Sequence, residues 1–170
     1  KELSEVGSSV IYRLTGIDTL LKLEQTESVR NDLSIGYGNL SNIYRNDLND
    51  SENAIICAQK SLEFAKSIGK NKSYGISLYS LARAYAMNNE YEKSADFLNQ
   101  SLKFFKENSN KEIFQKSVIE LNLGIILFEL DKEKARALLI KSIERLGKKE
   151  ISIYGTIDIN KRINLIFNFC

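Results

Sequence analysis

Residues 78–85 read LYSLARAY, and this stretch decides the fold because its arrangement occurs twice more along the chain. Residues 37–44 read YGNLSNIY and residues 120–127 read ELNLGIIL, so each copy has a Leu, then a small residue, then a large apolar residue three positions further on. The landmark leucines are spaced by 41, 42 and 42 residues: Leu40, Leu81, Leu123 and Leu165. A fixed period of this length predicts a stack of repeated helical units.

A second pattern of mostly small residues follows each of the first three landmarks. Its members are Ala54, Ala58 and Ser61; Ser94, Leu98 and Ser101; and Ala135, Leu139 and Ser142. Steps of four and three place each set on one face of a helix, where small side chains let neighbouring helices approach closely. Polar segments at 46–50, 88–90 and 130–132 separate the two patterns, and we expect Asn and Asp to form turns there, with Asp50 or Ser51 capping the next helix.

The composition favours long helices, because the 170 residues contain no proline and only nine glycines. We expect an all-α chain of about eight helices, at about 3–25, 30–46, 51–68, 72–88, 91–107, 112–129, 132–147 and 150–168. The length fits a single domain over 1–170. Because the chain begins with Lys1 and opens inside a helical pattern, we expect a portion of a longer protein, with 1–29 as the second helix of a truncated repeat.

The charge balance is nearly even, at a formal net charge of +2, and no long block of one sign occurs. Direct binding to nucleic acid or to a membrane is therefore not expected. No apolar run approaches the length of a membrane span. The two cysteines, Cys57 and Cys170, lack metal or redox spacing, so we expect a buried or idle thiol and a reducing, cytoplasmic location.

The residues of most catalytic sites are missing. Histidine is absent, which removes the Ser-His-Asp, Cys-His and His-ligated metal arrangements. No glycine-rich phosphate loop occurs in a strand-turn-helix context, and carboxylate pairs such as Glu90 and Glu92 fall in predicted turns, where solvated caps are common. We expect no enzyme, and no catalytic, cofactor-binding or metal-binding residues.

These repeats resemble the tetratricopeptide repeat, most clearly over residues 78–101, where residues 91–95 look like the family's junction between turn and second helix. The resemblance implies a right-handed superhelical solenoid of antiparallel helix pairs, with repeats at 30–68, 72–107 and 112–147 and a terminal or capping helix at 150–170. The repeat is longer than the usual length of about 34 residues. That length is similar to a long-repeat branch found in kinesin light chains and in bacterial and archaeal signalling regulators.

The resemblance also implies a binding site, because the first helix of each pair lines a concave groove in this family. The expected peptide-binding residues on that face are Asn39, Asn42, Arg45, Tyr79, Ser80, Arg83, Asn122, Ile125 and Asn164. An amide both donates and accepts hydrogen bonds, so recurring Asn side chains suit a peptide backbone, although each could equally bond to a neighbouring helix or to water. The carboxylate clamp of chaperone-binding members is not expected, because Ile35, Ile76, Val118 and Asn160 occupy its places.

The leading functional prediction is an interaction module that holds a segment of a partner protein, or of another domain of the same chain, in this groove. One alternative is a sensory or regulatory domain of a larger signalling protein, such as a peptide-responsive transcription regulator or an NTP-driven switch. A second alternative is homo-oligomerisation through the terminal helix at 150–168.

Overall fold

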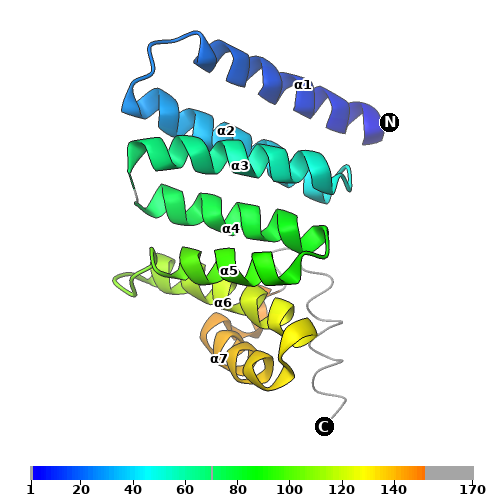
Figure 1. The fold of residues 1–170 in the computed structure, drawn as a ribbon, viewed down its shortest axis with the longest axis vertical. Coiled ribbons are helices and arrows are strands. Elements are labelled where there is room, and N and C mark those ends of the chain that lie inside the picture. The colour runs from blue at the N-terminus through cyan, green and yellow to red at the C-terminus, as the bar shows by residue number, and fades with distance from the viewer. Residues whose placement is uncertain (1, 70, 152–170) are drawn as a thin grey trace. The chain divides into compact units, whose positions relative to one another are not determined.

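The computed structural model describes residues 2–69 and 71–151, and within these ranges every regular element is an α-helix (Figure 1). The helices are α1 (Glu2–Leu21), α2 (Glu27–Asn46), α3 (Ser51–Ile68), α4 (Lys72–Met87), α5 (Tyr91–Leu102), α6 (Asn110–Leu130) and α7 (Lys132–Ile151). The chain divides into two compact units, which we call unit 1 (Lys1–Phe104) and unit 2 (Phe105–Cys170). The expected all-α class is confirmed.

Several helix ends differ from their expected positions. Helix α1 ends at Leu21 rather than near residue 25, and α2 begins three residues early because Thr26 caps it by accepting the Val29 N–H. The Gln25 side-chain amide donates to the Leu20 carbonyl, which helps to close the preceding helix. Helix α5 is also shorter than expected, and α7 continues to Ile151; the rest of the expected helix at 150–168 lies outside the described residues.

Asparagine and aspartate form the turns between the paired helices in unit 1, as the sequence predicts. Asn49 and Asn89 adopt positive φ angles of 52° and 59°, the left-handed region in which Asn is tolerated better than most residues. Asp50 then caps α3, because its carboxylate accepts the Asn53 N–H at 3.0 Å. The hydrogen bonds from both Asn53 groups to this carboxylate lower the Asp50 pKa below its ordinary value.

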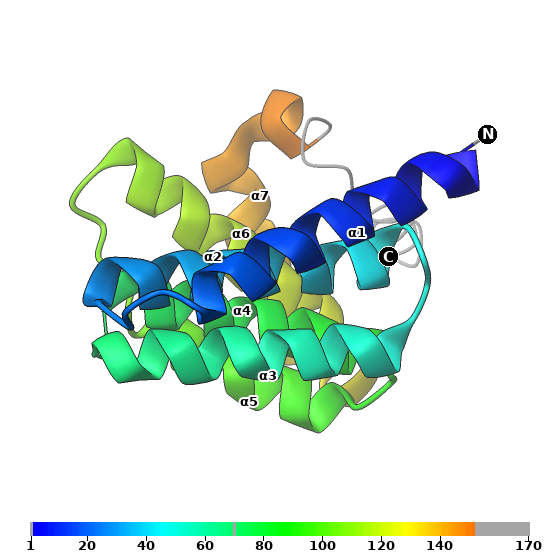
Figure 2. The ribbon, with the colours of Figure 1, turned by 90° about the horizontal axis from the view of Figure 1, so that it is seen from above.

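In unit 1, α2 pairs with α3 and α4 pairs with α5, so that the first and second helices of the pairs form two layers (Figure 2). The buried clusters lie between these layers. One contains Leu33, Tyr37 and Leu40 with Ile17 of α1, and the other contains Ala54, Ala58 and Leu81. Leu40, Leu81 and Leu123, the three landmark leucines among the described residues, are therefore core residues, which explains why they recur with the repeat.

A cluster of three buried serines joins α2, α3 and α4. The Ser34 and Ser77 hydroxyl oxygens are 3.2 Å apart, and those of Ser61 and Ser77 are 2.9 Å apart. The Ser61 hydroxyl also donates to the Ser34 carbonyl at 2.8 Å. Hydroxyl side chains at these positions satisfy each other while allowing the three helices to approach closely.

Unit 2 is built on the antiparallel pair α6 and α7, whose core contains Leu121 and Leu139. Gly124 allows the close approach of the two helices. A Cβ atom at this position would lie 2.7 Å from Leu139 Cγ, closer than carbon atoms can pack. The small residue that follows the landmark leucine Leu123 is therefore a glycine for a steric reason in this repeat.

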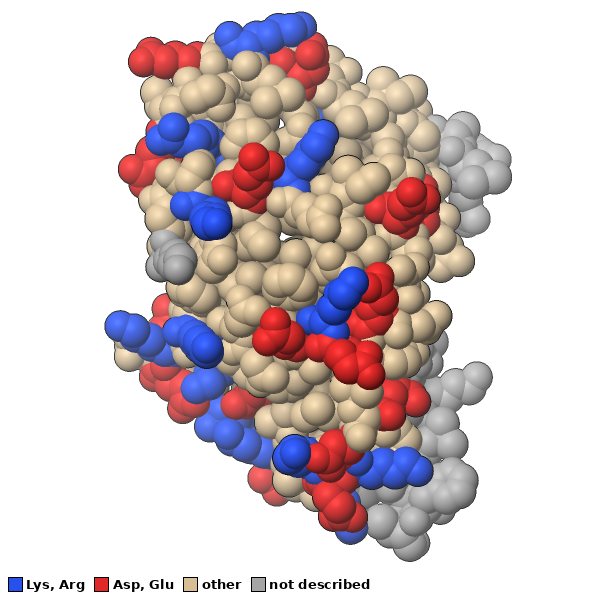
Figure 3. Space-filling view, in the orientation of Figure 1, with Lys and Arg blue, Asp and Glu red and all other residues tan. Residues whose placement is uncertain are grey.

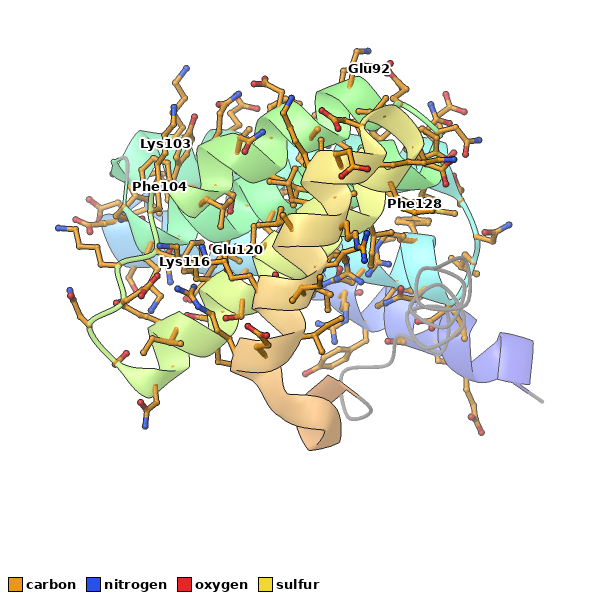
Figure 4. The ribbon with its side chains drawn as sticks, turned by 90° about the horizontal axis from the view of Figure 1, so that it is seen from below. Glu92, Lys103, Phe104, Lys116, Glu120 and Phe128 are labelled. Atoms are coloured by element: carbon orange, nitrogen blue, oxygen red, sulfur yellow. The ribbon has the colours of Figure 1, made fainter. Side chains whose placement is uncertain are left out.

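An ion-pair network also connects the helices of unit 2. Glu120 on α6 has a side chain only 6% exposed, and its carboxylate pairs with Lys141 Nζ at 3.3 Å and Arg145 Nη1 at 3.2 Å. Arg145 pairs as well with Glu107, and Glu107 also pairs with Lys116. Lys116 lies about one helical turn before Glu120 on α6, and Figure 4 labels both side chains. Two cations balance the buried carboxylate, which would otherwise be costly to desolvate.

Candidate functional site

The expected binding residues of unit 1 lie together on the outward side of α2 and α4. We call this surface the α2/α4 face and define it by Ile35, Asn39, Asn42 and Arg45 of α2 and Ile76, Tyr79, Ser80 and Arg83 of α4. The two isoleucines are exposed, at 53% and 44%, and the other six side chains are half-buried. None of the eight belongs to the fully buried set of its helix, so the core does not account for their presence.

Equivalent positions of the two repeats occur on both helices of this face. Two contacts hold α2 and α4 side by side: the Ser73 hydroxyl donates to Asn31 Oδ1 at 3.2 Å, and Ser34 meets Ser77 as described above. Three pairs of face residues are each separated by 41 residues, Ile35 with Ile76, Asn39 with Ser80, and Asn42 with Arg83. Along the helices, the exposed isoleucines are followed by the amide and hydroxyl groups of Asn39 and Ser80 and then by the guanidinium groups of Arg45 and Arg83.

Two guanidinium groups dominate the cationic end. Arg45 Nη2 donates to Asn42 Oδ1 at 3.4 Å, and the Arg83 guanidinium lies 5.4 Å from the centroid of the Tyr79 ring. Burial, and secondarily the charge of Arg83, lower the Arg45 pKa to about 10. Arg45 stays protonated at neutral pH, but its charge is partly desolvated and lies near a like charge.

Within residues 2–69 and 71–151, no carboxylate forms an ion pair with either of these two cations. Asp47 is close enough to favour the charged form of Arg45, yet among the described residues neither Arg45 nor Arg83 forms an ion pair. A guanidinium presents a planar fork of N–H donors that matches a carboxylate. The cationic end can therefore accept an anionic group from outside the chain.

The opposite side of unit 1 has a different character. Figure 3 shows the side on which α3 and α5 lie, and over unit 1 the Lys and Arg side chains drawn there are interspersed with Asp and Glu. This side forms no continuous basic stripe of the kind that phosphate backbones require. Within the described ranges, no helix is long and apolar enough to cross a bilayer.

The remaining expected site residues belong to unit 2 or fall outside the structure. The Asn122 amide donates to the Val118 carbonyl of its own helix at 2.8 Å, and Ile125 packs against the Leu121 and Leu139 core. Asn164 lies outside the described residues, as does Cys170. Of the expected residues, only the six in unit 1 are shown to share one surface.

Cys57 is buried, as the sequence predicts for one of the two thiols. It lies in the core cluster of α2 and α3, where burial raises the thiol pKa to about 11. Because the thiolate is the reactive form, this cysteine is protected from nucleophilic and redox chemistry at neutral pH. The described residues also contain no group of three or more His, Cys, Asp or Glu side chains arranged to hold a metal ion.

Sequence reasoning did not identify the ion-pair network of unit 2. A signal was present, because Glu120 is a single carboxylate between Ile119 and Leu121 in an otherwise apolar stretch of α6. A charge in such a position is rarely buried without a partner. Its partners on α7 lie 21 and 25 residues further along the chain, so helix pairing had to be known to name them.

The comparison with protein families matches residues 32–107 to the tetratricopeptide repeat. These residues form tetratricopeptide repeats. Searches of curated proteins and of solved structures found no significant match. The matched range contains the α4–α5 pair, the α2–α3 pair except the first five residues of α2, and all eight residues of the α2/α4 face. Tetratricopeptide repeats generally mediate protein–protein interaction, and they are typically not catalytic. The assignment to the long-repeat branch remains a prediction.

Proposed function

We propose that this protein is an interaction module and that the α2/α4 face holds a segment of a partner protein. The observation that carries the proposal is the presence of half-buried amide, hydroxyl and guanidinium groups on a repeat surface that the core does not use. Asn39 and Ser80 are equivalent residues of the two repeats, so both repeats present at this position a polar group that can bond to main-chain N–H and C=O groups. The partner segment comes from another protein or from another domain of the same chain, and the role is not catalytic.

The test uses the intact chain and a displayed library of random short peptides. Peptides selected on the native protein are measured against N39A/N42A/S80A, and we expect their affinity to fall by about tenfold or more, as several polar contacts are lost together. Circular dichroism and the thermal midpoint should stay unchanged, because none of the three side chains is fully buried.

The matched control is Q59A/E63A, which truncates two exposed side chains of α3 on the other layer. Selected peptides should bind this variant as tightly as the native protein. If N39A/N42A/S80A keeps its affinity for every selected peptide, the α2/α4 face is not the binding surface.

A further inference from the structure

Helix α1 packs on α2 with one side, and the described residues leave its opposite side uncovered (Figure 1). The packed side carries Val10, Ile17 and Leu20, which belong to the first core cluster. On the uncovered side, Tyr12 is 82% exposed and the neighbouring Ile11 is 66% exposed, more than any other large apolar residue among those described. Adjacent apolar side chains at this exposure mark a candidate contact surface for another molecule.

The residues of the uncovered side follow the spacing that one helix uses to pack along another. Starting at Glu5, exposed residues recur in alternating steps of three and four, which keeps them in one line along the helix. Lys22 directly follows α1 and continues the line, because its N–H bonds to the Thr19 carbonyl at 3.2 Å. We call this line the α1 outer face, and it consists of Glu5, Ser8, Tyr12, Thr15, Thr19 and Lys22.

The α1 outer face is complementary to a second copy of itself. In one antiparallel arrangement of two copies, every member of the line comes opposite another member. The opposed pairs are Tyr12 with Thr15, Ser8 with Thr19, and Glu5 with Lys22. Two-fold symmetry repeats each pair, so both ends of the interface join an acidic to a basic side chain. In a parallel arrangement each charge would face its own copy, so the charges favour a second chain that runs antiparallel.

Burial of this surface against a second copy costs little. The Thr15 and Thr19 hydroxyls donate to the carbonyls of Ile11 and Thr15, at 2.9 and 2.8 Å, so they are already satisfied within the helix. Lys22 pairs with Asp18 at 2.5 Å, but both side chains are mostly exposed, and such a surface pair contributes little stability. Lys22 is therefore able to pair with a carboxylate of a second copy as well.

Gly16 lies beside Thr15 and fits the same arrangement. A Cβ atom at this position would have no neighbour within 4 Å in the chain, whereas a Cβ atom at Gly124 would lie 2.7 Å from Leu139 Cγ. Packing within the chain therefore does not explain this glycine, although glycine weakens the middle of a helix. Without a side chain, Gly16 leaves room for the Tyr12 ring of a second copy, which the antiparallel arrangement brings opposite Thr15.

We propose that the protein forms a homodimer in which the α1 outer faces of two copies pack antiparallel around a two-fold axis between Tyr12 and Thr15. A contact between two single helices buries less surface than the interface of a stable complex, so we expect the dimer to dissociate in the micromolar range. The inference goes beyond the proposed function, because no residue of the α1 outer face belongs to the α2/α4 face. The dimer carries two α2/α4 faces, which allows it to hold two partner segments at once.

Sedimentation equilibrium of the intact chain tests the homodimer. Between about 1 µM and about 500 µM, the native protein should change from monomer to dimer. Glu5→Lys and Lys22→Glu each place like charges opposite one another at both ends of the interface, and each should raise the dissociation constant about tenfold. The double variant E5K/K22E restores opposite charges and should regain the native dissociation constant. A mixture of the two single variants should form mixed dimers in preference to self-pairing.

Further variants separate the interface from the fold. Tyr12→Ser removes the exposed ring at the centre of the interface and should also raise the dissociation constant about tenfold. Circular dichroism and the thermal midpoint of this variant at about 1 µM should match those of the native protein, because the monomer does not bury the ring. The matched control E63K/K66E reverses two exposed charges of α3, outside the α1 outer face, and should dimerise like the native protein.

Three results would overturn the homodimer. One is a native chain that stays monomeric at about 500 µM. Another is a dimer whose dissociation constant is unchanged in Glu5→Lys, Lys22→Glu and Tyr12→Ser, which would place the contact elsewhere, for example at residues 150–168. The third is a double variant E5K/K22E that dimerises no better than the single variants, which would exclude the antiparallel pairing. Peptide affinity of N39A/N42A/S80A tests the α2/α4 face separately.

Discussion

At the scale of single residues, the same position of the repeat performs different tasks in different copies. Ser61 and Ser101 both donate across to the first helix of their pair, to the Ser34 and Gly75 carbonyls. The equivalent Ser142 instead donates to the Leu138 carbonyl of its own helix. The small volume is common to all three positions, whereas the hydrogen bond depends on the neighbouring backbone.

Ser94 gives a prediction at this scale. Its hydroxyl is fully buried and has no hydrogen-bond partner, and the equivalent residues Ala54 and Ala135 have no hydroxyl at all. An unsatisfied buried hydroxyl is destabilising, so we expect Ser94→Ala to stabilise the protein by about 1 kcal/mol in urea unfolding. Ser101→Ala is the matched control on the same helix, because it removes a hydroxyl that is hydrogen-bonded, at 2.7 Å, and should destabilise by about 1 kcal/mol. A loss of stability in both variants would contradict this account.

At the scale of helices, the ion pairs of Glu107 make the stability of unit 2 sensitive to acid. Glu107 precedes α6 and pairs with Lys116 of α6 and Arg145 of α7. The Lys116 hydrogen bond and charge, together with the Arg145 charge, lower the Glu107 pKa below its ordinary value. A carboxylate whose pKa is lower in the folded state stabilises that state above its unfolded pKa. This contribution disappears as the pH falls through the lower, folded-state pKa.

A carboxyl NMR titration tests this prediction. We expect the Glu107 midpoint to lie below the ordinary glutamate value in the native protein and to rise towards it in Lys116→Met. The stability of the native protein should also fall more on acidification below about pH 4 than that of Glu107→Gln. Lys132→Met, which removes an exposed lysine at the start of α7, serves as the control and should leave the Glu107 midpoint unchanged.

The helix pattern was predictable because the repeat constrains residues that the core requires. Leu40 and Leu81 recur as buried side chains, and the Asn and Asp clusters between the helices carry the left-handed and capping positions. The early start of α2 was missed, although Thr26 followed by Glu27 is a recognisable N-terminal signal. The spacing of apolar and polar residues along one helix is a local property of the sequence, so the helices could be predicted from it.

The environment of the candidate site depended on contacts that the sequence does not fix. The repeat register predicted that Asn42 and Arg83 share a face, but not that Arg45 would be partly desolvated near Arg83. Such effects arise from the distance between neighbouring helices and from side-chain rotamers. The Glu120 network is similar, because its members come together only when α6 and α7 are aligned.

At the scale of the whole molecule, the two compact units differ in the size of their cores. The described part of unit 1 has five helices with two buried clusters, whereas that of unit 2 has one helix pair with a cluster centred on Leu121 and Leu139. Helical repeats gain stability from each neighbour, and a single pair buries little apolar surface. We therefore expect the fragment 1–104 to unfold cooperatively and the fragment 105–151, which is the described part of unit 2, to do so much less.

Circular dichroism melts of the two fragments check this expectation. Fragment 1–104 should keep a sigmoidal transition and a strongly helical signal per residue. Fragment 105–151 should show a weaker signal and a broad transition. A sharper transition in the smaller fragment would contradict this expectation and show that unit 2 unfolds more cooperatively than unit 1.

The serine cluster of α2, α3 and α4 has a consequence for protein engineering. Ser34 and Ser77 correspond to Gly75 and Gly36 in the neighbouring copies, so the three-hydroxyl contact belongs to this junction and is not part of the common repeat pattern. A designed array of identical consensus repeats would lack this contact. Exchanging the order of the copies would place serine opposite residues that do not complete the hydrogen bonds. The repeats share a period, but they are not interchangeable modules.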